Sequence, residues 1–204
     1  MGPFRVPGRG TVDVMGKIVV FAGMSLDGMF EGVDGDISWH RVDEPMHDHF
    51  NEVLFAAGAV MGGRVNHQMM NDFWPTADDD PDAPAPIREF AEFWRSVKKY
   101  VVSRTLPDTT EWNTTVLRGL DPVEVRAIAE SLDGDLILGG GQLIESARHI
   151  DLIDEWRVYV HPVVVGAGRH LFLDGPGADL ELVETRAFPN GVVLTRYAVH
   201  RSAA

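Results

Sequence analysis

Hydrophobic residues along the chain fall into two patterns, short continuous runs and longer segments with helical spacing. Residues Ile18 to Ala22 are all apolar, which is typical of a strand buried on both faces. Between residues 44 and 57 apolar positions recur at helical spacing, and Gly58 stands where a glycine commonly ends a helix. The pattern therefore predicts a buried central strand followed by an amphipathic helix.

Strand and helix patterns continue to the end of the chain. Helix signals are densest around Asp121, the predicted N-cap, with Pro122 and Glu124 in the first turn and Gly134 past the end. Asn190-Gly191 joins two strand-like segments within 180–201 and predicts a hairpin. The remaining predicted strands cover residues 59–61, 98–103, 136–138 and 155–166, and the remaining predicted helices cover 64–70, 87–94 and 142–149.

The order of these elements predicts the fold class. Strands and helices alternate until antiparallel strands close the chain. We therefore expect an α/β fold, a three-layer αβα sandwich with a mostly parallel central sheet and antiparallel strands at its C-terminal edge. Residues 16–204 are expected to form a single domain, and residues 1–15, rich in Gly, Pro and Arg, a flexible N-terminal extension.

Composition narrows the class of protein. The 204 residues are 45% apolar and include no cysteine, which excludes disulfides, thiolate metal sites and a cysteine nucleophile. A formal net charge of −13 disfavours binding to nucleic acid or anionic lipid. No apolar run reaches the roughly 18 residues that span a bilayer. We expect a cytoplasmic protein with a small-molecule partner and no nucleic-acid or membrane partner.

Three predicted strand exits carry residues suited to phosphate groups. Glycines 139–141 let a backbone approach a diphosphate without a Cβ in the way, and the alternative is a tight turn. Gly62-Gly63-Arg64 adds a guanidinium at a second exit, and Ser103-Arg104-Thr105 adds two hydroxyls and another guanidinium at a third. In a parallel sheet, ligands bind beyond the carboxyl ends of the strands. Three such exits together favour a phosphate-bearing ligand over isolated turns.

The histidines indicate less. His47 and His49 are two residues apart and point in diverging directions on a helix. His161, before Pro162, is typical of a strand residue with a satisfied imidazole. We therefore predict no metal site. The nucleophile elbow G-x-S-x-G and the phosphate loop G-x-x-x-x-G-K-[ST] do not occur in the sequence.

Five segments, in order, resemble the dihydrofolate-reductase-like superfamily, in its branch similar to the C-terminal reductase domain of bacterial riboflavin biosynthesis. They are VVFAGMSLDG, VMGGRVNHQMM, VVSRTL, LILGGGQLIES and VHPVVVGAGRHLF. The resemblance covers residues 17–201 and implies NADPH as the cofactor. The cofactor-binding residues that it implies are Ala22, Gly63, Arg64, Asn66, Ser103, Arg104, Thr105, Gly139, Gly140, Gly141, Gln142 and Leu143.

Within that set, the resemblance places Arg64 near the 2′-phosphate, with Ser103 and Arg104 along the adenine-ribose end. Glycines 139–141 would receive the diphosphate and nicotinamide side. The family commonly follows Gly-Arg with a Thr-Tyr-Glu-like triplet, whereas residues 66–68 here are Asn-His-Gln. Asn66 is left with two alternatives, capping the helix or bonding a phosphate.

The resemblance also implies a substrate pocket at the end of the first strand, edged by Ser25, Leu26, Gly28 and Trp39. Hydride transfer needs a proton donor. Trp39 and Glu44 stand five residues apart, the spacing of the Trp and the acid in dihydrofolate reductases, and Asp43 lies beside Glu44. Asp27 is a further catalytic candidate. The alternatives are that Asp43 and Glu44 stabilise a helix start and that Asp27 forms a turn.

The function that these features imply is an NADPH-dependent oxidoreductase acting on a pyrimidine- or pterin-like ring. The closest family analogy is 5-amino-6-(5-phosphoribosylamino)uracil reductase of riboflavin biosynthesis. Two alternatives stay open, a dihydrofolate-type reductase and a non-catalytic nucleotide- or pterin-binding module, and a flavin-type cofactor is not excluded. By the same analogy we expect a homodimer.

Overall fold

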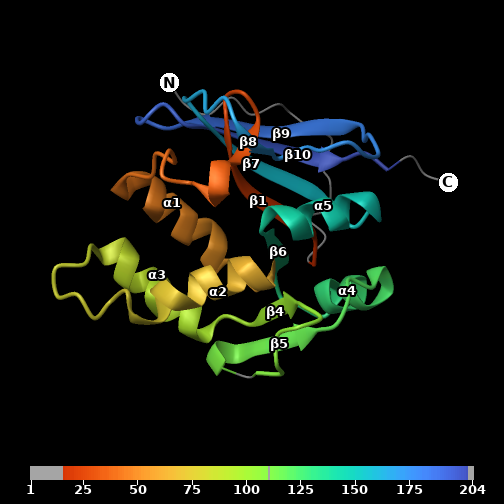
Figure 1. Cartoon of the computed structure of the whole chain (residues 1–204), viewed down its shortest axis with the longest axis horizontal. Helices are drawn as coiled ribbons and strands as arrows, with labels where there is room; N and C mark the ends of the chain where they lie inside the picture. The colour runs from red at the N-terminus through yellow and green to blue at the C-terminus, as the bar shows by residue number, and fades with distance from the viewer. Residues whose placement is uncertain (1–15, 110, 202–204) are drawn as a thin grey trace.

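The structure is a computed structural model that describes residues 16–109 and 111–201, so the expected extension at 1–15 lies outside the described residues. Its main sheet has eight strands in the order β5-β4-β3-β6-β1-β7-β10-β9 (Figure 1). Pairing is parallel from β5 to β7 and antiparallel where β10 joins β7 and β9. The predicted fold class is confirmed. The strands are β1 Ile18–Ser25, β3 Ala57–Gly63, β4 Lys99–Val102, β5 Thr114–Leu117, β6 Asp135–Gly139, β7 Glu155–His161, β9 Leu180–Ala187 and β10 Val193–Val199.

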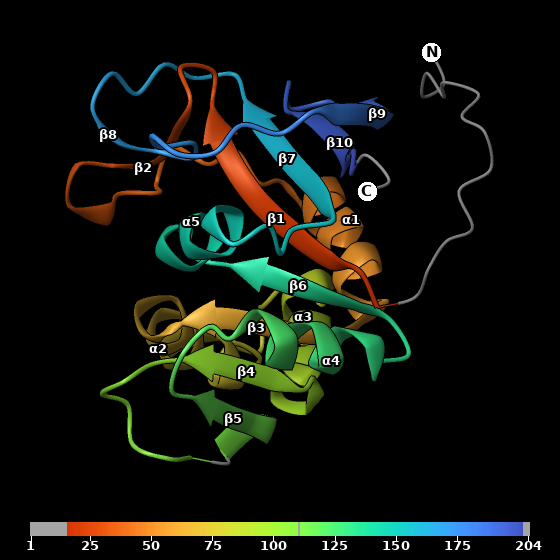
Figure 2. The same ribbon diagram turned by 90° about the vertical axis from the view of Figure 1, so that its right-hand side faces the viewer.

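Helices cover both faces of this sheet. Helices α4 and α5 lie on the face turned to the viewer in Figure 2, and α1 and α3 lie on the opposite face. The described helices are α1 Glu44–Phe55, α2 Arg64–Phe73, α3 Ala85–Ser96, α4 Pro122–Glu130 and α5 Gly141–His149, with short 3-10 turns at Val33–Gly35, Trp74–Thr76 and Glu111–Asn113. Within the described residues, none of the helices is long and apolar enough to cross a bilayer.

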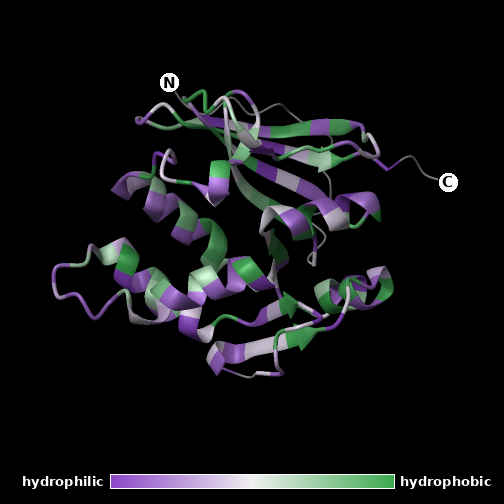
Figure 3. Ribbon diagram, in the orientation of Figure 1, coloured by the Kyte–Doolittle hydropathy of each residue, from purple (hydrophilic) through white to green (hydrophobic). Residues whose placement is uncertain are grey.

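The core fills both sides of the sheet because consecutive strand residues point to opposite faces. Ile18, Val20 and Ala22 belong to the large cluster that includes residues of α4 and α5. Phe21 packs against Phe50 of α1 on the other side, in a smaller cluster. Strands β1 and β6 are mostly apolar, whereas the helices alternate apolar and polar residues (Figure 3). This double burial explains the continuous apolar run of the first strand.

A small ribbon stands apart from the main sheet, at the end where strands β3, β4 and β6 terminate (Figure 2). It pairs β2, Met29–Gly32, with β8, Gly168–His170, in antiparallel fashion. Both strands are too short to be predicted from the pattern of apolar residues. That pattern did not predict β5 either, which has only four residues, two of them threonines.

Two helix ends differ from the sequence prediction. Helix α1 ends at Phe55, and Gly58 lies inside β3 instead of terminating the helix. Gly58 is needed for packing, because a Cβ there would come within 2.7 Å of the Leu132 Cβ atom. Helix α4 begins as expected, with the Asp121 carboxylate accepting hydrogen bonds from two first-turn amides. It ends at Glu130, four residues before Gly134.

Candidate functional site

The three strand exits that were predicted to bind phosphate lie side by side at one edge of the sheet. Strand β3 stands between β4 and β6, with Gly62 paired to Gly139 and Gly63 paired to Val102. The chain therefore brings residues 62–64, 103–105 and 139–141 together, as the parallel arrangement requires.

Asn66 packs onto two of these exits. An added Cβ would lie 2.8 Å from the Asn66 Oδ1 atom at Gly62 and 3.0 Å from the Asn66 Cβ at Gly140. Gly140 also has φ +89°, which favours glycine. Gly63 occupies the N-cap position of α2, without a side-chain cap. The expectation that Asn66 caps this helix is therefore wrong, and its binding to a phosphate stays a prediction.

Helix α5 begins at Gly141, next to the guanidinium of Arg169, a residue that the sequence motifs did not indicate. An added Cβ at Gly141 would meet the Arg169 guanidinium at 2.5 Å and the Phe30 ring at 2.9 Å. The Arg169 Nε atom donates to Glu31 at 2.9 Å across the β2–β8 ribbon. Its guanidinium lies over the Phe30 ring, 5.4 Å from the centroid. Arg169 belongs to the quoted segment VHPVVVGAGRHLF, but only the tertiary structure brings it to the glycines.

The side chains at the other two exits differ in exposure. Arg64 is exposed and donates a hydrogen bond to Gln68, and Arg104 and Thr105 are also exposed. Ser103 is buried, and its hydroxyl accepts the amide hydrogens of Thr105 and Leu106. The two arginines are therefore accessible to a ligand, whereas the serine hydroxyl already organises the turn. Of the other predicted cofactor residues, Gln142 is exposed, and Ala22 and Leu143 have their side chains in the core.

At the exit of β1, Asp27 ties the turn to the loop before β8. Its carboxylate accepts hydrogen bonds from the Ser25 hydroxyl at 2.6 Å and from the amides of Val165 and Gly166 at 3.1 and 2.8 Å. These bonds, the Ser25 bond first, lower the pKa of Asp27 to about 2. Asp27 therefore carries no proton at neutral pH. Gly28 follows with φ +88°, and Leu26 is 67% exposed.

Trp39, Asp43 and Glu44 follow in a loop and the start of α1. The Trp39 indole N–H donates to the Asp36 carbonyl at 3.0 Å. Asp43 is the N-cap of α1, accepts the Met46 amide at 3.2 Å, and receives a further bond from the Asn190 side chain. Asp43 therefore does stabilise the helix start, as its alternative proposed. Glu44 is the exposed first residue of that helix. Catalytic roles for Asp43 and Glu44 stay predictions.

The histidines on α1 point in different directions, as expected. His49 contacts the Tyr159 hydroxyl at 3.1 Å, whereas His47 lies against Trp74 and Phe90. The imidazole of His161 is satisfied, because its Nδ1 atom accepts the backbone N–H of Arg41 at 3.0 Å. Among the described residues, His, Asp and Glu side chains form no group of three or more that could hold a metal ion.

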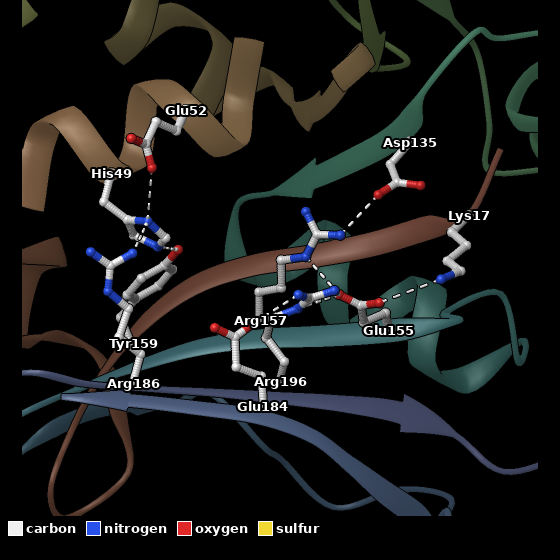
Figure 4. A network of polar contacts seen from close by, with 10 residues as sticks. All are labelled: Lys17, His49, Glu52, Asp135, Glu155, Arg157, Tyr159, Glu184, Arg186 and Arg196. Atoms are coloured by element: carbon white, nitrogen blue, oxygen red, sulfur yellow. Dashed lines mark hydrogen bonds and ion pairs between the residues drawn. The ribbon is translucent and has the colours of Figure 1, made fainter. Parts of the chain in front are cut away.

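A second polar cluster lies between α1 and the sheet (Figure 4). It borders a cavity of about 190 Å³ whose lining includes Asp135 at the amino end of β6, away from the glycines. The buried Glu155 binds Arg157 at 2.6 Å and Arg196 at 3.0 Å. Arg157 also binds Asp135, and Arg196 also binds Glu184, each at 2.9 Å. Because these charges already satisfy one another, the cluster indicates a structural network and not a ligand site.

Comparison with known proteins identifies a family that matches this chain and solved structures with the same fold. The family described as RibD C-terminal domain matches residues 16–194. The uncharacterized protein YyaP of Bacillus subtilis (strain 168) is 32% identical over 187 residues, which cover 89% of this chain and 94% of that protein. A putative riboflavin biosynthesis protein from Shewanella sp. PV-4 superposes with a TM-score of 0.67 at 21% identity, covering 91% of this chain and 99% of that one. A dihydrofolate reductase from Enterococcus faecalis, complexed with NADP(H), gives 0.61 at 15% identity, covering 92% and 98%.

Proposed function

The chain belongs to the RibD C-terminal domain family, and from that premise we propose that it is an NADPH-dependent reductase of a pyrimidine- or pterin-like ring. The family and the likeness to riboflavin-biosynthesis proteins support a reductase-type function. The cofactor and the substrate ring are the proposed part. In this proposal NADPH lies along the carboxyl edge of the sheet, from β4 across β3 and β6 to β1.

One observation carries the cofactor proposal. Helices α2 and α5 begin at this edge with glycine N-caps and no side-chain cap. Uncapped helix starts leave amide groups for an anion, and the helix dipole favours a negative charge there. Gly63 and glycines 139–141 are partly exposed at this edge. Backbone N–H groups at these two helix starts are suitable hydrogen-bond donors to a diphosphate.

The exposed guanidinium groups of Arg64 and Arg104 suit the 2′-phosphate that distinguishes NADPH from NADH. When bound, NADPH supplies a hydride. The chain's own task is to hold the substrate ring at the end of β1 and to deliver one proton. We propose Glu44 as the proton donor, because turn bonds occupy the Asp27 carboxylate and Asp43 caps α1.

A second candidate function is a nucleotide- or pterin-binding module without turnover. It is favoured by the engagement of Asp27 and Asp43 in turn and cap bonds, which leaves the exposed Glu44 as the remaining proposed donor. A dihydrofolate-type reductase would use the same edge and the same Glu44. As a homodimer surface we propose the edge strand β9 and its neighbour β10, where Leu180, Val183 and Val193 are exposed.

The test is a calorimetric titration with NADPH and, separately, with NADH. We expect NADPH to bind more tightly, and Arg64→Ala and Arg104→Ala each to weaken NADPH about tenfold or more, as the loss of a charge-assisted hydrogen bond does. Lys98→Ala removes one positive charge just before the amino end of β4 and is the matched control. Absence of NADPH binding, or equal binding by all variants, would contradict the proposal. NADPH oxidation with a ring acceptor then separates the enzyme from the module.

A further inference from the structure

Two histidine rings stack on each other at the end of β1, a feature that the proposed function does not use. The rings of His40 and His161 lie 4.6 Å apart at an interplanar angle of 8°. The indole of Trp39 meets both rings edge-on, at 4.3 Å from His40 and 5.6 Å from His161. His161 is the last residue of β7, whereas His40 comes from the loop before α1.

The stack rests on a glycine of the first strand. An added Cβ at Gly23 would lie 2.7 Å from the Cε1 atom of His40 and 3.2 Å from the Nε2 atom of His161. Gly23 precedes Ser25 by two residues and pairs with Tyr159 of β7. The His40 ring therefore fills a flat space between a strand backbone and another aromatic ring, at the edge where a substrate ring is proposed to bind.

His161 is firmly held, whereas His40 is not. His161 is 1% exposed, and the Arg41 amide fixes its ring through Nδ1. Among residues 33–45, only Trp39 and His40 are partly buried, and all the others are exposed. The Nε2 atom of His40 is buried without a hydrogen-bond partner among the described residues. A buried nitrogen without a partner costs free energy, so this position is a poor one for His40.

The two stacked imidazoles are uncharged at neutral pH. Burial lowers the pKa of His161 to about 4, with His40 and Arg41 contributing in the same direction. Burial also lowers the pKa of His40. Neutral aromatic faces in a desolvated position bind flat, uncharged rings better than charged groups.

We propose that Gly23, the face of His161 and the edge of Trp39 form the subsite for a flat, uncharged heteroaromatic ring, and that His40 occupies this subsite until the ring displaces it. This inference rests on the proposed function, because it specifies where the substrate ring of that reductase stacks. His161 is the platform, and His40 is a resident competitor whose side chain leaves the stack while Trp39 and the Arg41–His161 hydrogen bond stay in place.

The probe for the test is pterin, whose own fluorescence reports stacking. We expect His161→Ala to weaken pterin binding about three- to tenfold, as the loss of one stacked pair does. His40→Ala is expected to tighten pterin binding about threefold or more, because the competitor for the site is removed. A role in folding alone would not move the two affinities in opposite directions.

Two further variants serve as controls for the pterin-binding experiment. His161→Phe keeps a flat face and is expected to bind pterin within about twofold of the wild type. His200→Ala changes an exposed histidine at the end of β10 and is the matched control. If pterin binds neither the wild type nor His40→Ala, or if the His40 and His161 variants bind it equally, the inference is overturned.

NADPH titration of the same proteins separates the two levels of the argument. Normal NADPH binding together with unchanged pterin affinities in all variants overturns the ring subsite and leaves the reductase proposal intact. Loss of NADPH binding in the wild type overturns the reductase proposal, while opposite pterin effects of His40→Ala and His161→Ala still support the subsite.

Discussion

Removal of the Glu155 carboxylate is the perturbation whose cost is best determined by the structure. Glu155 is 2% exposed and lies among basic groups (Figure 4). It binds the Arg157 Nε atom at 2.6 Å and Arg196 at 3.0 Å, and Lys17 approaches it at 3.8 Å. In Glu155→Ala these cations lose the carboxylate that they share.

The expected loss of unfolding free energy depends on the ion pairs that remain in the variant. Breaking a buried pair by removing one partner costs about 3 to 5 kcal/mol, because the other charge is left uncompensated. Here Arg157 keeps Asp135 and Arg196 keeps Glu184, each at 2.9 Å. We therefore expect the lower end, about 3 kcal/mol of unfolding free energy. For a chain of this length that corresponds to a fall in Tm of roughly 6 to 12 °C.

Urea unfolding, followed by far-UV circular dichroism, measures this loss. Glu155→Gln keeps the side-chain volume, so a loss of similar size would assign the effect to charge. Glu181→Ala removes an exposed carboxylate of β9 and should change stability by less than about 0.5 kcal/mol. The reasoning is refuted if both Glu155 variants lose less than about 1 kcal/mol with an unchanged denaturant dependence.

Three further outcomes follow from the packing and the titrations. Gly58→Ala should lose about 1 to 3 kcal/mol in urea unfolding, because its Cβ would meet the Leu132 Cβ at 2.7 Å, and wild-type stability would contradict this. Gly141→Ala should keep an unfolding free energy within about 1 kcal/mol of wild type, since the flexible end of Arg169 can move. Calorimetry should nevertheless show that this variant binds NADPH more weakly. An unchanged NADPH affinity would argue against a cofactor at this turn. The pKa of His161, about 4 in the folded state against 6.5 for the free side chain, means that unfolding binds a proton between these values. Its contribution to stability is complete above pH 6.5 and is lost as the pH falls through about 4, so urea midpoints should show a flatter acid dependence in His161→Gln.

Some residues of the candidate site could be predicted from the sequence and others could not, as was also true of the fold. The glycines at 139–141 and the exposed arginines were identified from the sequence because each motif follows a strand pattern directly. The proximity of Arg169 to Gly141 depends on the β2–β8 ribbon, whose strands are more than a hundred residues apart in the chain. The stack of His40 on His161 depends on a similar separation, and no local pattern reports it.

By itself, the sequence determined the alternation of strands and helices, the mostly parallel sheet, the Asp121 cap and the three glycine- or arginine-bearing strand exits. These features arise from interactions within a few residues, such as side-chain alternation, helical spacing and capping, and they add up along the chain. Tertiary structure alone decided that Gly58 serves packing, that Asp27 binds the amides of residues 165 and 166, and that His40 covers Gly23. Each of these depends on side chains that meet only after the whole sheet has assembled, because burial and register set the distance between residues that are remote in sequence.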